Sequence, residues 1–209
     1  MDQTSLPEPG LLEKGLADLK DELYDTLGNA NLHLQPETVT RCLHAKVLAK
    51  LKMLEAILRR LILLLAMTLE LAPVRPRTAR PAAPLPDGVE DVTASFLSHL
   101  PARYRMALMP RPLGPPGDFT GVKTARRSGS VLAMPLLRRA AGLLKVMKHP
   151  EAAARRMARL IERMKKRGEM KPYCLPLARR HTLRPELALL TGAITLQVNA
   201  ALADWPDTG

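Results

Sequence analysis

Apolar residues recur every three or four positions over much of the chain, which is the periodicity of α-helices that bury one face. The first such stretch runs from Leu11 to Leu27, and Gly28 follows as a residue that can adopt the left-handed conformation that closes a helix. The acidic residues of this stretch lie largely off its apolar stripe, so we expect them to form a solvated face or to dock on a basic helix. They are Asp18, Asp21, Glu22 and Asp25.

A long helix is predicted from Pro36 to Ala72, because proline suits a first helical position and no further proline or glycine occurs before Pro73. Its apolar residues alternate spacings of four and three, as in the a/d positions of a coiled coil or helical bundle. From Ile57 onward apolar residues cover the other sides too, so protein of the same chain or of a second copy must surround this half. Residues 1–72 thus form a predicted N-terminal helical pair. The candidate helix interface, here called the leucine seam, consists of Leu51, Leu54, Leu58, Leu61 and Leu65.

Sequence rich in helix breakers follows the long helix. Residues 73–88 are a proline- and arginine-rich linker, which we expect to be extended because proline has no amide hydrogen to donate. Residues 89–109 are predicted to hold a short helical segment. Residues 110–130 are rich in proline and glycine without periodicity, which is typical of a disordered or functional loop.

Residues 131–209 form a predicted basic helical segment that ends in a C-terminal helix. The periodicity places helices from Leu136 to Met147, from Pro150 to Arg167 before Gly168, and from Pro185 to about Ala203. No convincing alternating strand occurs. We therefore predict an all-α fold, an irregular helical bundle around one long helix that pairs with the first and last helices.

The composition excludes several classes of protein. The 209 residues are 46% apolar and carry a net charge of +12, with six aromatic residues and two cysteines. This apolar content is too high for a wholly disordered chain, and the cysteines are too few for a disulfide scaffold. The scarcity of aromatic residues also disfavours an all-β fold.

Residues 137–185 hold 15 basic and 3 acidic side chains, which is as much net charge as the whole chain. Nucleic acid is one expected partner, because each lysine or arginine that neutralises a phosphate releases a counterion. Anionic lipid is another, because a basic amphipathic helix can lie among lipid headgroups. Arginine, alanine, proline and leucine are frequent throughout, so an ordinary soluble surface accounts for the charge as well. The candidate anion-binding residues are Arg155, Arg156, Arg159, Arg163, Lys165, Lys166 and Arg167.

No residues converge in a pattern typical of an active site or a metal site. Cys42 and His44 point about 200° apart on a helix, so they cannot act on one atom locally. Adding Cys174 and His181 does not give the close pairs of a structural zinc site. No Walker loop, dinucleotide-binding fingerprint, nucleophile elbow or kinase signature occurs. We predict a protein that is not an enzyme and has no cofactor or metal, with buried reduced thiols and surface imidazoles.

Targeting and function are predicted from the same features. The first residues lack the pattern of a secretory signal, so a cytoplasmic protein is expected. The apolar run Leu61–Leu69 rises only about 14 Å as a helix, and a bilayer core needs about 30 Å, so no integral membrane span is expected. The first functional hypothesis is a helical interaction or scaffold protein whose leucine seam binds a protein partner or a second copy. The alternatives are a nucleic-acid-binding protein that uses residues 137–185 and, of lower rank, peripheral association with anionic lipid.

Overall fold

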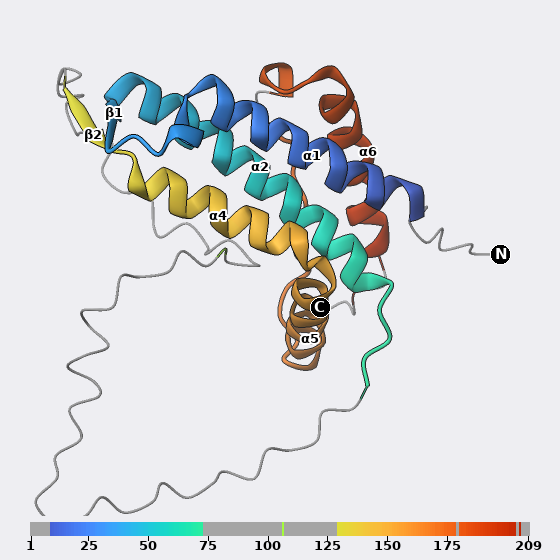
Figure 1. The fold of residues 1–209 in the computed structure, drawn as a ribbon. Coiled ribbons are helices and arrows are strands. Elements are labelled where there is room, and N and C mark those ends of the chain that lie inside the picture. The colour runs from blue at the N-terminus through green and yellow to red at the C-terminus, as the bar shows by residue number, and fades with distance from the viewer. Residues whose placement is uncertain (1–8, 73–105, 107–128, 179, 204, 206–209) are drawn as a thin grey trace, which may run out of the picture.

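The structure is a computed structural model that describes residues 9–72, 106, 129–178, 180–203 and 205. This part of the chain is mostly helical, which confirms the predicted all-α fold (Figure 1). The helices are α1 (Pro9–Asn29), α2 (Arg41–Met67), α4 (Met134–Lys148), α5 (Pro150–Lys166) and α6 (Pro185–Ala201). Two 3-10 turns, η1 (Leu32–Leu34) and η2 (Arg180–Thr182), and two strands, β1 (Thr38–Thr40) and β2 (Ser130–Leu132), complete the elements of the described part.

The predicted linker, short helical segment and loop, at residues 73–88, 89–109 and 110–130, fall almost entirely outside the described residues. Only Met106, Gly129 and Ser130 of these ranges are described.

Helix α2 begins later than predicted, at Arg41 instead of Pro36. The residues before it are β-branched and form strand β1, and the hydroxyl of Thr40 then caps the helix by accepting a hydrogen bond from the Leu43 amide at 3.3 Å. The helix runs unbroken for 27 residues and ends at Met67 rather than Ala72. The predicted long helix therefore exists, but it is shorter than predicted at both ends.

The structure contains a small antiparallel sheet that the sequence pattern did not predict. Strand β1 pairs with β2, with Val39 opposite Val131. Backbone hydrogen bonds from Ala133 to Glu37 and from Arg41 to Gly129 extend the pairing on both sides. Three-residue strands are too short to show an alternation of apolar and polar residues, so the sequence pattern does not reveal them.

Helix α2 lies at the centre of the fold and contacts α1, α4, α5 and α6. Its predicted pairing with the first and last helices is confirmed, and Figure 1 shows α1, α2 and α4 side by side with α5 viewed almost end-on. Four residues of the leucine seam, Leu51, Leu54, Leu58 and Leu61, are at most 1% exposed, and Leu65 is half-buried. The leucine seam therefore fills the core of its own chain.

The C-terminal end of helix α1 differs from the prediction. Gly28 does not adopt the left-handed conformation, and the helix continues to Asn29. Asn31 and Gln35 are the residues with positive φ there, both at 52°. Asparagine tolerates this region better than most residues because its short amide bonds locally. At the end of α5, Gly168 has φ of 64° and stops the helix as expected.

Two buried carboxylates hold the helices together. Glu22 of α1 is 4% exposed, forms an ion pair with Lys50 of α2, and accepts a hydrogen bond from the Arg184 amide at 3.1 Å, just before α6. Glu55 of α2 is 1% exposed and binds the guanidinium of Arg139 of α4 through both of its oxygens. The acidic side of α1 thus docks in part on basic residues of the same chain, which was one of the two predicted outcomes.

Candidate polyanion-binding face and apolar cavity

Helix α5 presents one face to α2 and the opposite face to solvent. The buried face consists mainly of alanines together with Met157 and Ile161, and α2 and α5 make the most extensive contact between any two elements of the described part. The small alanine side chains allow the two backbones to approach closely. All of the basic side chains of α5 except that of Lys165 are therefore exposed.

Some of the exposed cations of α5 have carboxylate partners one turn away. Arg155 pairs with Glu151 at 3.2 Å, and Lys166 pairs with Glu162 at 2.8 Å. The ammonium group of Lys166 lowers the pKa of Glu162 by hydrogen bonding and by charge. All four side chains are at least half exposed, so water screens these pairs and they contribute little to folding.

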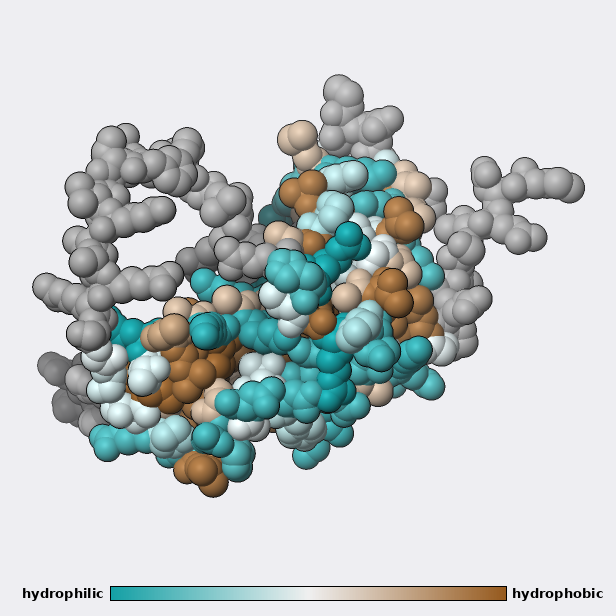
Figure 2. Space-filling model, turned by 90° about the horizontal axis from the view of Figure 1, so that it is seen from above, coloured by the Kyte–Doolittle hydropathy of each residue, from teal (hydrophilic) through white to brown (hydrophobic). Residues whose placement is uncertain are grey.

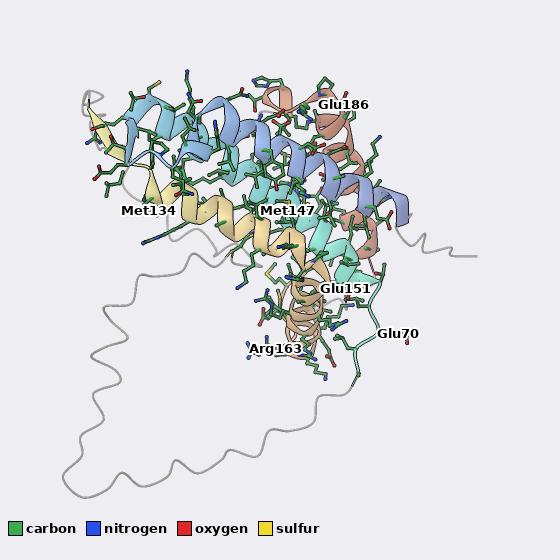
Figure 3. The ribbon with its side chains drawn as sticks, in the orientation of Figure 1. Glu70, Met134, Met147, Glu151, Arg163 and Glu186 are labelled. Carbon is green, nitrogen blue, oxygen red and sulfur yellow. The ribbon has the colours of Figure 1, made fainter. Side chains whose placement is uncertain are left out.

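Arg156, Arg159 and Arg163 have no carboxylate partner in the part of the chain that the structure describes; we call these three residues the arginine stripe. Two of their guanidinium groups donate to backbone carbonyls, Arg156 to that of Ala152 and Arg163 to that of Arg159, both at 3.3 Å. At about 100° per residue the three lie within about 60° of each other around the helix axis. Figure 3 labels Arg163 on α5. The stripe is thus a row of exposed guanidinium groups along α5.

Two of the seven predicted anion-binding residues have other partners within the chain. Lys165 is half-buried, and its ammonium nitrogen lies 5.5 Å from the ring centroid of Trp205, which is a cation–π contact within the chain. Arg167 follows the end of α5 and pairs with Glu169 at 3.5 Å. The structure thus brings Arg155, Lys166 and the arginine stripe together on one exposed face, and separates Lys165 from them.

Part of the charge in residues 137–185 has a structural role. Arg139 binds the buried Glu55, and Arg184 pairs with the exposed Asp25 and contacts Glu22. The Asp25 carboxylate raises the pKa of Arg184 through hydrogen bonding and charge. These partners come from α1 and α2, far away in the sequence, so counting charges by segment does not separate them from the cations that are available to a ligand.

An apolar cavity of about 400 Å³ lies between α2, α6 and the irregular segment 172–178. Asn199 of α6 fixes that segment, because its amide group both accepts from the Cys174 amide and donates to the Cys174 carbonyl, each at 3.0 Å. The lining comes from helices and from a segment that are distant in sequence, so the sequence pattern gave no signal for the cavity. Its apolar wall includes Ala56, Leu63, Met157, Val198 and Leu202.

Arg60 brings a positive charge into the wall of this cavity. Its guanidinium donates to the hydroxyl of Thr195 at 2.7 Å and to the carbonyl of Leu175, and it contacts the thiol of Cys174. Burial lowers the pKa of Arg60, and the nearby thiol opposes this shift. Burial likewise raises the pKa of Cys174, which Arg60 only partly offsets. The thiol is therefore neutral at pH 7, and it does not balance the charge of Arg60.

The remaining candidate groups do not form a site. No three histidine, cysteine or acidic side chains cluster as metal ligands within the described ranges. Both cysteines are free, but Cys42 is exposed, so the expectation of buried thiols is wrong for this residue. It lies in the first turn of α2, where only one face of the helix is covered. None of the helices that the structure describes has the length and apolar character that crossing a membrane requires.

Comparison of the chain with protein-family models, with curated proteins and with solved structures found no match.

Proposed function

We propose that this protein is a non-enzymatic helical protein that binds nucleic acid through the exposed basic face of α5. The observation that carries the proposal is the arginine stripe, whose three guanidinium groups have no carboxylate partner among the described residues. Exposed arginines without carboxylate partners keep most of their hydrogen-bond donors available. A guanidinium binds two phosphate oxygens at once, which a lysine ammonium group does less well.

The geometry of the face favours the backbone of a duplex over single strands. The exposed cations from Arg155 to Lys166 span about 16 Å along the helix, at 1.5 Å per residue. Duplex DNA presents about one phosphate charge per 1.7 Å of its axis, so several phosphates lie within that length. No aromatic residue occurs on α5 on which a base could stack.

Insertion of α5 into anionic lipid is less favourable than binding to nucleic acid. An amphipathic helix binds a bilayer by burying its apolar face in the headgroup region. In this protein that face, which includes Met157 and Ile161, is already buried against α2. Insertion would require α5 to leave the bundle, whereas binding to phosphates uses the face that is already exposed.

The scaffold hypothesis ranks second for a similar reason. It rested on the leucine seam as a surface for a protein partner or a second copy. Four of its five residues are at most 1% exposed and pack among helices of the same chain. A partner that used these leucines would first have to displace α1, α5 or α6.

The test compares two triple variants that remove the same charge from neighbouring helices. The first replaces the arginine stripe, as Arg156→Gln, Arg159→Gln and Arg163→Gln. The matched control replaces Arg138, Lys145 and Lys148 with glutamine, three exposed cations of α4 in the same basic segment. Binding to a short DNA duplex is measured at several salt concentrations, and circular dichroism checks that both variants are folded.

For the wild-type protein we expect the logarithm of the binding constant to fall with the logarithm of salt with a slope of about −3 or steeper. The stripe variant should lose about 2.7 of that slope, because each phosphate contact contributes about 0.9. The α4 variant should keep most of it. No binding to DNA, or an equal loss in the two variants, would overturn the proposal. Binding to anionic vesicles but not to DNA would favour lipid instead.

A further inference from the structure

The cavity beside Arg60 combines a half-buried cation with a mainly apolar wall. Removing a guanidinium from water is unfavourable unless a carboxylate or another anion balances its charge. Arg60 is about half-buried, yet it has no carboxylate partner among the described residues, and it contacts a hydroxyl, a carbonyl and a neutral thiol. The neighbouring Arg59 differs, because Glu55 binds it at 3.3 Å.

We infer that this cavity is a binding site for an apolar monocarboxylate, with the guanidinium of Arg60 holding the carboxylate and the cavity wall holding the hydrocarbon part. This inference does not depend on the proposed nucleic-acid binding, since the arginine stripe lies on the opposite face of α5 from Met157, which lines the cavity. A guanidinium has five N–H donors, and the three partners of Arg60 leave donors for a ligand.

The size and lining of the cavity define the class of ligand. A volume of about 400 Å³ is within the usual range for small-molecule sites, and the wall offers mainly aliphatic side chains and the methionine thioether. Arg59 also lines the cavity, but it pairs with Glu55, so Arg60 is the lining cation that matches one negative charge of a ligand. A doubly charged phosphate would place excess negative charge in an apolar space, and a neutral lipid would leave Arg60 unbalanced.

The cavity is open on the side of the segment 172–178. Tyr173 and Leu175 line it and are 72% and 67% exposed, respectively. Large apolar side chains at an open edge allow an amphiphile to enter without crossing the core. Because Cys174 lies between them, its thiol can report whether the cavity is occupied.

The test uses decanoate as the probe and 1-decanol as its neutral counterpart, with the full chain at neutral pH. Calorimetry measures binding to the wild-type protein and to three variants. Arg60→Gln removes the charge, Ala56→Phe fills the cavity, and Lys52→Gln removes an exposed charge from α2 outside the cavity as the control. In a second measurement, the alkylation rate of Cys174 is followed in a Cys42→Ser background with and without each probe.

Decanoate is expected to bind the wild-type and Lys52→Gln proteins equally, to bind Arg60→Gln at least tenfold more weakly, and not to bind Ala56→Phe. It should slow alkylation of Cys174 at least fivefold, whereas decanol should slow it much less. If Arg60→Gln does not fold, the alkylation experiment and Ala56→Phe still decide. The inference is overturned if decanoate does not bind, if Arg60→Gln or Ala56→Phe binds it as well as wild type, or if decanol protects Cys174 equally.

Discussion

Gly15 and Gly28 both belong to α1, but a methyl group would meet different surroundings at each. At Gly15 it would lie 2.9 Å from a methyl carbon of Leu61 and 3.3 Å from one of Leu190, whereas at Gly28 nothing lies within 4 Å. Alanine favours the helix over glycine by up to about 1 kcal/mol. Gly28→Ala should therefore raise the free energy of unfolding by about 0.5 kcal/mol, and Gly15→Ala should lower it because Leu61 is tightly packed.

Urea denaturation of the two variants measures this difference. Equal stabilisation by both would show that α1 does not approach α2 as closely as the structure has it.

The buried Glu55 is a second residue whose replacement gives a sharp prediction. Glu55→Leu removes a buried acceptor and leaves Arg139 without this carboxylate, so we expect a loss of about 3 kcal/mol in the free energy of unfolding. Replacing both residues by leucine should cost less than the sum of the single changes, because the second change removes the cation that was left behind. A double-mutant cycle in urea measures this coupling. Additive losses would show that the two side chains do not interact.

The burial of a residue was predictable from the sequence where it follows helical spacing. The leucines of the seam are examples, since their spacing alone places them on the inner side of α2. Glu55 and Glu22 were not predictable as buried residues, because Arg139 and Arg184 lie 84 and 162 positions further along the chain. Only the packing of separate helices decides which charges become partners.

At the scale of elements, helix α6 offers a direct test of its orientation. It has hardly any charged residues, so its periodicity is weak, yet Leu187 is fully buried and Leu189 is 79% exposed. Leu187→Ala should lower the free energy of unfolding by about 2 to 4 kcal/mol by creating a cavity. Leu189→Ala should change it by less than about 0.5 kcal/mol. Chemical denaturation distinguishes the two, and similar losses would mean that α6 is rotated about its axis.

The sequence predicted where the helices lie better than it predicted which of their side chains form the candidate site. It located α4, α5 and α6 to within a few residues, because proline starts and apolar periodicity coincide there. For the candidate site it named the cations of α5 but did not separate those with partners. Part of that signal was present, since Glu151 and Glu162 precede Arg155 and Lys166 by four residues, the spacing at which helical side chains pair. The contact of Lys165 with Trp205 had no such local signal.

At the scale of the whole molecule, helices from both ends of the sequence form one hydrophobic core around α2. On the face seen from above, hydrophobic residues form several areas separated by hydrophilic ones (Figure 2). The apolar cavity exists only because α6 and the segment 172–178 meet α2. Neither the core nor the cavity belongs to any single stretch of sequence, which is why periodicity predicted the fold class but not the cavity.

The central position of α2 predicts how the whole molecule opens. Because four helices cover it, its middle amides can exchange with solvent only when much of the core separates, so their exchange should report the global free energy of unfolding. We expect the slowest exchange between Leu54 and Ile62, and faster exchange in the short sheet of β1 and β2 and at the N-terminal end of α1. Hydrogen exchange followed by mass spectrometry on the full chain measures this order. Faster exchange in the middle of α2 than in α1 or α4 would contradict the arrangement, because it would mean that the central helix opens without its neighbours.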